Sequence, residues 1–349
     1  MNRINKIKPS DRLSAVLAKK QWDSIAKPLG SFGLLEEFIE KIASVQGTKD
    51  IDISKRAVVV MCADNGVVCE GVTQTGSEIT ALSAVAIAEG RSNINALADA
   101  YSTDVISVDI GVNRDTESRF IIDRKIAYGT QNIAVSPAMT LSQAEKAVCV
   151  GMDIVRDLKN KGFRIIVTGE MGIGNTTTAS AVSAVLLDMP VEEVTGRGAG
   201  LTSEGLERKI SAIKRAIEFN RPDRDKPFEV LAKVGGFDIA GMTGLFLGGA
   251  VYGIPIIIDG VISAAAAAIA YKINPLCAEY MLAGHVSGEP AGIKLLELMG
   301  LKAVINAGLR LGEGTGGIML LPLLDGAVAL YRNAHRFDEI GMERYVELK

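Results

Sequence analysis

Two glycine-rich stretches hold residues that could bind a phosphate and move a proton. In the first, TGEMGIGNTTT (residues 168–178), Gly172 and Gly174 let the backbone turn tightly, and Asn175 or Thr176 could cap the helix that follows. Exposed backbone N–H groups and the helix dipole together make an anion site. The spacing nearly matches a P-loop, but Asn175 stands where the lysine belongs, which favours holding a phosphate over transferring one. A glycine-rich turn with a threonine cap explains the same residues equally well.

The second stretch is GLRLGEGTGG (residues 308–317), in which Glu313 is surrounded by glycines that leave room for a ligand. The chain has only two histidines, so a carboxylate with a pKa raised by partial burial is the expected general base. Glu170, in the first stretch, offers a second carboxylate. For either residue alone, an exposed glutamate in a loop is the commoner situation. Two acids in two such loops indicate a catalytic site more strongly than either one.

Composition sets limits on the kind of protein. The 349 residues are 48% hydrophobic and 23% charged, a normal globular balance, and the length fits two domains or one large α/β domain. A net charge of −3 argues against a nucleic-acid partner. Four cysteines without a CxxC pair argue against disulfides and zinc. The N-terminal stretch MNRINKIKPSDR has no apolar core of a signal peptide, so we predict a cytoplasmic protein.

Residues 239–258 contain no charge and are long enough to raise the possibility of a membrane span. Five glycines interrupt the segment, Pro255 follows them, and no cluster of basic residues flanks it closely. We therefore predict a buried small-residue helix, a turn and a strand, and no membrane partner.

Short β-branched runs recur along the chain, each followed by a glycine or a polar loop. They occupy residues 57–61, 105–110, 164–168, 230–234 and 254–258, with a weaker sixth at 281–283. Continuous apolar runs separated by helical segments predict a parallel, Rossmann-like α/β sheet buried on both faces. Ligands of such sheets bind at the carboxyl ends of the strands, where both glycine-rich loops are expected.

Both ends of the chain look helical. Ser10 and Asp11 are cap candidates, KPLGS at residues 27–31 breaks the first helical stretch, and residues 311–330 are small and apolar. We predict a smaller helical domain built from residues 1–50 and 311–349, packed on a parallel-sheet α/β domain of residues 51–310.

Four further polar residues allow two interpretations each. Asp238 could bind a ribose or cap a helix, and the cap is the simpler explanation. His285 could be catalytic or structural, and its isolation in the sequence favours a structural role. Arg197 and Lys209 could contact a phosphate or be surface charges.

Several motifs taken together resemble one family, the nicotinate-nucleotide–dimethylbenzimidazole phosphoribosyltransferases. They occur in order over nearly the whole chain: KPLGSFGLLE (27–36), ADNGV and EGVT (63–67 and 70–73), GEMGIGNTT (169–177), TGRGAG (195–200), GGFDIA (235–240) and GEGTG (312–316). The resemblance implies a dimeric enzyme that transfers phosphoribosyl from nicotinate mononucleotide to an aromatic lower-ligand base of cobamides, giving an α-ribotide and nicotinate. It also implies a parallel-sheet domain with a small helical domain from both termini.

The resemblance assigns roles to particular residues. It implies that Glu313 is the general base and Glu170 the second active-site acid. Four positions match those that hold the nucleotide in the family: Gly172, Lys209, Ser287 and Gly288. The pyridinium of nicotinate mononucleotide departs as a neutral ring, so we predict neither a metal nor a cofactor.

The chain departs from the family pattern in the base pocket, expected at residues 73–83. Thr75-Gly76 stands where a Tyr-Pro pair is usual, and Leu82-Ser83 where a Gln-Met pair is usual. Leu82 cannot hydrogen-bond a benzimidazole nitrogen. Asn65 also replaces a usual histidine.

These changes motivate the hypothesis that the acceptor is phenol or p-cresol, as in a family branch that pairs two paralogous subunits. The partner could thus be an identical chain or a paralog. Two alternatives stay open at this point: a non-catalytic paralogous subunit, and a nucleotide-binding protein of the same fold.

Overall fold

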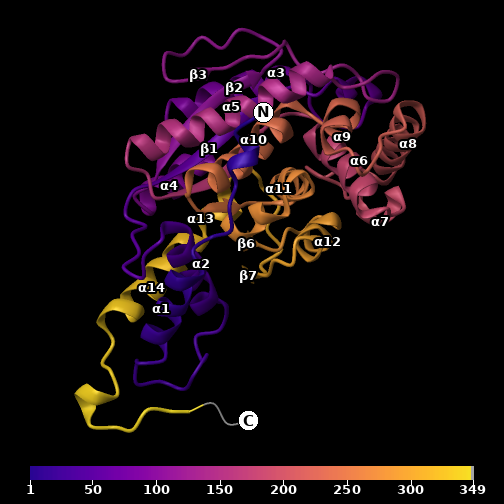
Figure 1. The fold of residues 1–349 in the computed structure, drawn as a ribbon. Helices are drawn as coiled ribbons and strands as arrows, with labels where there is room; N and C mark the ends of the chain where they lie inside the picture. Colours follow the sequence, from indigo (N-terminus) through magenta and orange to yellow (C-terminus); the bar gives the residue numbers. More distant parts are fainter. Residues whose placement is uncertain (347–349) are drawn as a thin grey trace.

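The computed structural model, which describes residues 1–346, is built around one seven-stranded parallel sheet (Figure 1). The strand order is β3-β2-β1-β4-β5-β6-β7, so the chain runs outward from β1 in one direction and then returns to β4 on the other side. The predicted parallel α/β fold is confirmed. The strands are β1 (Arg56–Ala63), β2 (Asp104–Gly111), β3 (Ile122–Asp123), β4 (Ile165–Met171), β5 (Ile256–Ile258), β6 (Met281–His285) and β7 (Ala303–Ile305).

The central strand β1 shows why its apolar residues are continuous rather than alternating. Ala57, Val59 and Met61 belong to the core on one face of the sheet. Val58 and Val60 belong to the core on the other face. Both faces are covered by helices, so neither set of side chains reaches solvent.

Within residues 1–346, seven longer helices and one short one cover the first face. They are α5 (Leu141–Asn160), α6 (Asn175–Leu187), α7 (Val191–Val194), α8 (Ser203–Asn220), α9 (Pro227–Val234), α10 (Phe237–Tyr252), α11 (Val261–Ile273) and α12 (Ala291–Leu298). The second face is covered by α1 (Arg12–Trp22), α2 (Leu34–Gln46), α3 (Glu78–Ala88), α4 (Asn93–Ala100), α13 (Thr315–Ile318) and α14 (Leu320–Asn333). Short 3-10 helices occupy Ile4–Lys6, Gly66–Glu70, Pro275–Tyr280 and Asp338–Ile340.

One strand prediction is wrong. Residues 230–234 form the second half of helix α9, because Pro227 starts a helix at its first position and Lys233 pairs with Glu229 one turn earlier, at 2.5 Å. The buried residues Val230, Leu231 and Val234 follow a helical spacing. Conversely, β3 and β7 were not predicted, since these edge strands have only two and three residues.

The uncharged segment at residues 239–258 forms most of α10, a turn and β5. Helix α10 packs on α5 at very close range, which is possible because glycines lie at the contact. A Cβ added to Gly151 would lie 2.0 Å from the carbonyl oxygen of Gly241, and a Cβ added to Gly244 would lie 2.1 Å from the carbonyl oxygen of Val148. Among the described residues, no helix is both long and apolar enough to cross a membrane.

The helices from the two ends of the chain lie side by side (Figure 1, indigo and yellow). Asp11 caps α1 as predicted, its side chain accepting a hydrogen bond from the Leu13 N–H at 3.1 Å. The rings of Trp22 on α1 and Tyr331 on α14 have centroids 5.0 Å apart. Ile4 packs with the core on the opposite face of the sheet. The division into two domains with boundaries after residues 50 and 310 stays a prediction.

Candidate active site

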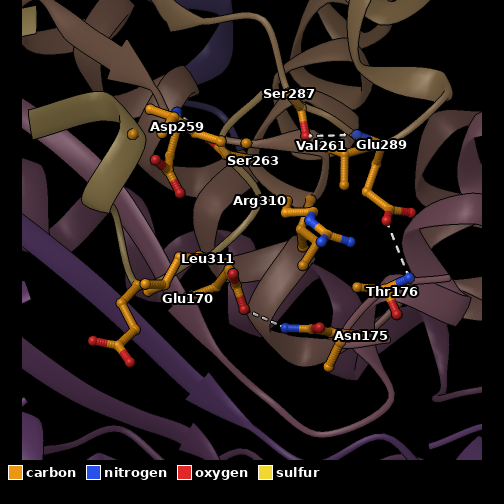
Figure 2. Close-up of a pocket in the computed structure, with 18 of the residues that line it drawn as sticks. Glu170, Asn175, Thr176, Asp259, Val261, Ser263, Ser287, Glu289, Arg310 and Leu311 are labelled. Carbon is orange, nitrogen blue, oxygen red and sulfur yellow. Dashed lines mark hydrogen bonds between the residues drawn. The ribbon is translucent and has the colours of Figure 1, made fainter. Parts of the chain in front are cut away.

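A pocket of about 280 Å³ lies at the carboxyl ends of β4, β5 and β6 (Figure 2). Each of these strands contributes one polar residue to its lining: Glu170 from β4, Asp259 directly after β5, and His285 at the end of β6. The chain reverses its strand order between β1 and β4, and ligands of parallel sheets bind beside such a reversal. The loops at residues 172–176, 198–199 and 309–316 complete the walls.

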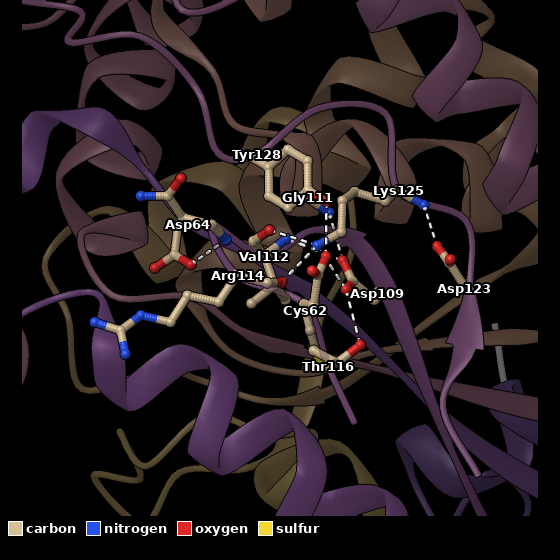
Figure 3. A network of polar contacts seen from close by, with 12 residues as sticks. Cys62, Asp64, Asp109, Gly111, Val112, Arg114, Thr116, Asp123, Lys125 and Tyr128 are labelled. Atoms are coloured by element: carbon tan, nitrogen blue, oxygen red, sulfur yellow. Dashed lines mark hydrogen bonds and ion pairs between the residues drawn. The ribbon is translucent and has the colours of Figure 1, made fainter. Parts of the chain in front are cut away.

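The carboxyl ends of β1 and β2, by contrast, carry a network of polar contacts (Figure 3). Asp109 forms an ion pair with Lys125 at 2.8 Å and accepts a hydrogen bond from the Val112 N–H at 2.9 Å. Asp64 accepts one from the Asn113 N–H at 2.7 Å. These carboxylates therefore hold loops in place, and neither lines the pocket.

Glu170 is buried at the floor of the pocket. Its carboxyl group accepts a hydrogen bond from the Asn175 side-chain amide. Burial, together with the nearby charges of Asp238 and Asp259, raises the pKa of Glu170 to about 8. At neutral pH this residue is therefore mostly protonated and able to donate a proton or a hydrogen bond.

Glu313 lines the same pocket from the GLRLGEGTGG loop. Its backbone is left-handed, with φ of +61°, between Gly312 and Gly314, which have φ of +90° and +92°. A left-handed backbone is costly for a residue with a side chain, and such strain is most often retained at functional sites. The Glu313 carboxylate accepts hydrogen bonds from the Asn93 side chain at 3.2 Å and the Ile94 N–H at 3.1 Å, at the start of α4.

The structure corrects the predicted cap of helix α6. The N-cap is Gly174, in a left-handed conformation with φ of +92°, and Asn175 and Thr176 are the first two helical residues. Asn175 cannot serve as a cap because its side chain turns to Glu170 instead. Gly172, Asn175 and Thr176 line the pocket, whereas Gly174 is not among the lining residues.

Lys209 is a fully buried side chain of α8 and not a surface charge. Its ammonium donates to the Thr176 hydroxyl at 2.9 Å and to the Gly196 carbonyl at 3.1 Å. Burial lowers the pKa of Lys209 to about 8. Lys209 thus acts on the pocket through Thr176.

Ser287 lines the pocket, and its hydroxyl accepts a hydrogen bond from the Glu289 N–H at 3.3 Å. Gly288 lies outside the lining and donates its N–H to the Leu309 carbonyl at 2.9 Å. Arg197 donates to the Leu201 carbonyl at 2.8 Å and is also outside the lining.

The residues expected in the base pocket lie apart from this cavity. Thr75 is exposed, Leu82 is 66% exposed on α3, and Ser83 is half-buried on the same helix. None of the three lines the pocket, although α3 touches its edge where the Thr80 hydroxyl accepts a hydrogen bond from the Ile173 N–H at 3.1 Å. Their assignment to the acceptor stays a prediction.

Asp238 is not the cap of helix α10, and its contact with a ribose stays a prediction. It is the second residue of α10, whose N-cap is Gly236, and it lies outside the residues that line the pocket. Its carboxylate accepts a hydrogen bond from the Asn65 amide at 3.4 Å, and burial raises the pKa of Asp238 to about 6. Asn65 in turn accepts a hydrogen bond from the Thr178 hydroxyl at 3.3 Å.

The lining residues that the sequence analysis missed include two charged ones, Asp259 and Arg310. Asp259 follows the apolar run 254–258 directly, and that position after a strand was the available signal. Arg310 stands three residues before Glu313 in a stretch already singled out for its glutamate. Among the described residues that line the pocket, Arg310 is the one lysine or arginine.

His285 is buried against Asp259, with 3.7 Å between its Nε2 and the Asp259 Oδ1. Burial on its own lowers the pKa of His285, but the neighbouring Asp259 carboxylate outweighs it and raises the pKa above its ordinary value. Among the described residues, no group of three or more histidines, cysteines or acids is arranged to hold a metal ion.

Fold and pocket together define a Rossmann-like α/β enzyme with several acidic residues, Glu170 and Glu313 among them, in a ligand site at the carboxyl edge of its sheet. A family model described as phosphoribosyltransferase matches residues 7–342. The chain belongs to the nicotinate-nucleotide–dimethylbenzimidazole phosphoribosyltransferase family and is thus an enzyme of the glycosyltransferase type.

Similar proteins cover the chain almost end to end. The nicotinate-nucleotide–dimethylbenzimidazole phosphoribosyltransferase of Acetivibrio thermocellus is 46% identical over 94% of this chain and 94% of its own length. That of Ruminiclostridium cellulolyticum is 43% identical over 99% of this chain and 98% of its own. A solved structure of the Thermus thermophilus enzyme superimposes with a TM-score of 0.89 at 36% identity, covering 96% of this chain and 100% of that one.

Proposed function

We propose that the protein transfers phosphoribosyl from nicotinate mononucleotide to an aromatic lower-ligand base, with Glu313 as the general base. The observation that carries the proposal is that Glu313 and Glu170, from distant parts of the chain, line one pocket. The names of the relatives above, each a phosphoribosyltransferase of this specificity, support the donor and the reaction type.

The two acids suit the chemistry of this transfer. A nitrogen or oxygen of the acceptor attacks C1′ of the ribose, and the bond from C1′ to the pyridinium nitrogen breaks, its electron pair returning to the ring. Nicotinate leaves with an uncharged ring nitrogen, so the leaving group needs no proton. The proton of the acceptor passes to the carboxylate of Glu313. Glu170, protonated at neutral pH, is placed to donate a hydrogen bond rather than to take a proton.

The donor carries a phosphate and a carboxylate, so its site needs positive charge and free hydrogen-bond donors. Arg310 supplies a cation in the lining, and Figure 2 shows its side chain among the lining residues. Thr176 and Ser287 supply hydroxyl groups, and Lys209 stands behind Thr176. A remote phosphate held in this way positions the reacting carbon.

The identity of the acceptor is the open part of the proposal. The names of the relatives favour 5,6-dimethylbenzimidazole. Leu82 and Thr75 favour phenol or p-cresol, because Leu82 offers no hydrogen bond to a second ring nitrogen. A phenolic hydroxyl has a pKa near ~10, so it also requires a base.

The partner subunit also belongs to the proposal. We infer a dimer with an identical chain or a paralog, as in the family that the motifs resemble. Helix α1 exposes Leu13, Val16 and Leu17 along one face, an arrangement that suits a contact with another protein. Sedimentation velocity tests the inference: a single-chain mass at micromolar concentration, with and without a co-expressed paralog, contradicts it.

A competition assay with a base-deficient variant tests the function. Purified protein receives nicotinate mononucleotide with equimolar 5,6-dimethylbenzimidazole, phenol and p-cresol, and products are followed by mass spectrometry. We expect one riboside phosphate in excess, and a loss of about 100-fold or more in turnover for Glu313→Gln with nucleotide affinity retained. The matched control is Glu297→Gln, an exposed glutamate on α12, which is expected to keep full activity.

Three other outcomes have distinct meanings. Full activity of Glu313→Gln contradicts the base assignment. Nucleotide binding without any product, even with a co-expressed partner, supports the non-catalytic paralog. An absence of nucleotide binding contradicts the proposed donor.

A further inference from the structure

Asp259 is a buried residue whose two carboxylate oxygens both accept hydrogen bonds from the loop that contains Glu313. Its Oδ1 accepts a hydrogen bond from the Gly317 N–H at 2.7 Å, and its Oδ2 accepts one from the Gly314 N–H at 3.3 Å. Gly314 directly follows Glu313, so Asp259 holds the backbone within one residue of that glutamate. Asp259 is itself fixed, because its own N–H donates to the Ser263 hydroxyl at 3.2 Å.

His285 forms the second support of the same loop. Its imidazole lies against Asp259 and occupies the space beside Gly316, where an added Cβ would be 2.1 Å from the ring. The loop can approach Asp259 only because Gly316 has no side chain there. Asp259 and His285 are each 3% exposed, so water has little access to either side chain.

The conformation that these contacts impose is an unfavourable one. Three successive residues, Gly312 to Gly314, have positive φ, and one of them is a glutamate. A free loop would relax from this geometry, because a non-glycine residue in the left-handed region is strained. The two hydrogen bonds to Asp259 oppose such relaxation immediately after Glu313, together with the hydrogen bond from the Thr315 hydroxyl to the Gly312 carbonyl at 2.7 Å.

We propose that Asp259, supported by His285, is the positioning residue of the reaction: it anchors the glycine loop so that the Glu313 carboxylate stands beside the pocket. The inference rests on the proposed function of Glu313. It assigns Asp259 no contact with the reacting atoms, so its loss affects the chemical step through the geometry of Glu313.

The test is Asp259→Asn, which keeps the shape of the side chain but offers one acceptor where two are needed. We expect kcat to fall about 100-fold, as for a displaced catalytic group, with KM for nicotinate mononucleotide within about threefold. Independently of activity, hydrogen exchange of the Gly314 and Gly317 amides should accelerate about tenfold. Asp109→Asn is the matched control: Asp109 is also a buried aspartate at a strand end that binds loop amides, but it lies outside the pocket, so kcat should be unchanged.

The outcomes separate this inference from the function on which it rests. Unchanged kcat and unchanged amide protection in Asp259→Asn overturn the positioning role, while an active Glu313→Gln contradicts the general base itself. A fall in kcat of similar size in Asp109→Asn also overturns the proposal, since it points to general destabilisation. Should Asp259→Asn fail to fold, Ser263→Ala removes the acceptor of the Asp259 backbone N–H and so loosens Asp259 more gently, and a kcat equal to that of the wild type then contradicts the proposal.

Discussion

Glu170 and Glu313 are the same residue type in one pocket, but their surroundings differ. Burial raises the pKa of Glu170 to about 8, and the charges of Asp238 and Asp259 add to the effect. Glu313 has a backbone N–H and an amide side chain as hydrogen-bond donors at the start of α4. Two acids in different surroundings can take different roles, which under the proposed function are hydrogen-bond donor for Glu170 and proton acceptor for Glu313.

The raised pKa of Glu170 leads to a prediction about stability. Between its ordinary pKa of 4.5 and about 8, the folded protein holds a proton that the unfolded chain has released. Raising the pH through this window therefore favours unfolding. Glutamine cannot titrate, so the Glu170→Gln variant does not lose stability in this way. The difference between the Tm of the variant and that of the wild type should therefore grow in favour of the variant as the pH rises from 5 to 8.

Thermal unfolding of both proteins at several pH values measures this difference. Similar Tm values near pH 5 and a growing gap toward pH 8 are expected. Two parallel curves across that range contradict a carboxyl group that is neutral in the folded state.

Arg310 gives a second prediction at the residue scale. It is the one lysine or arginine among the described residues that line the pocket, so it is the group best suited to attract an anionic ligand, and the proposed donor has two anionic groups. Arg310→Gln should raise KM for nicotinate mononucleotide at least about tenfold, since a charged hydrogen bond contributes about 1.5–3 kcal/mol.

Donor analogues identify the anion that Arg310 binds. Loss of discrimination against nicotinate riboside indicates the phosphate, and loss of discrimination against nicotinamide mononucleotide indicates the carboxylate. Equal KM values for variant and wild type with the full donor show that Arg310 binds neither.

At the scale of elements, the contact between α5 and α10 depends on glycine. A Cβ at Gly151 would lie 2.0 Å from the Gly241 carbonyl oxygen and 2.7 Å from the Leu245 nitrogen, so the helices would have to separate. Gly151→Ala should destabilise the protein by about 3 kcal/mol or more, at the upper end of overpacking effects. Chemical denaturation measures the free energy of unfolding.

Gly326 on α14 is the matched control for that substitution. It also lies inside a helix, but an added Cβ meets nothing within 4 Å. Alanine there should stabilise the protein by about 0.5–1 kcal/mol, because it favours the helix over the unfolded chain. Equal effects at the two positions contradict the packing explanation.

The sequence predicts those elements whose signal is local. Apolar runs identified β1, β2, β4 and β5, and a weaker run identified β6, since burial on both faces leaves a continuous pattern. Residues 230–234 were wrongly predicted to form a strand, because a short apolar run shows no clear strand or helix period. The proline at the start of α9 favours the helix. The edge strands β3 and β7 are too short to leave a signal.

The candidate site was predictable where glycines and acids share a stretch of sequence, as they do around Glu170 and Glu313. The anchoring contact of Asp259 was not, because it joins residues 259 and 314 through backbone amides, which no side-chain pattern reveals. The sequence could not decide whether Lys209 is a surface charge or a buried side chain, because burial depends on the whole fold.

At the scale of the whole molecule, the helices from the two termini share a core with the sheet. Trp22, Ile39 and Leu324 belong to the same cluster of buried residues as Val58 and Val60 of β1. No layer of polar side chains separates the two parts within that cluster. A continuous core of this kind favours cooperative unfolding.

Trp22 is the sole tryptophan of the chain and lies in the small helical part, so its fluorescence reports on that part alone. We predict that unfolding followed by Trp22 fluorescence coincides with unfolding followed by far-ultraviolet circular dichroism. A fluorescence transition at lower denaturant concentration contradicts this prediction and indicates a helical domain that unfolds by itself.

The parallel sheet also has a consequence for how the protein is made. Strand β1 pairs with β4, so that Arg56 meets Ile165, and helices α1 and α2 pack with α14 near the far end of the chain. Such distant contacts form slowly, because long loops must close first. On a ribosome, α1 and α2 emerge on the order of tens of seconds before α14 is synthesised. During that interval their apolar faces have no native partner, and the nascent chain is expected to depend on chaperones that bind exposed hydrophobic helices.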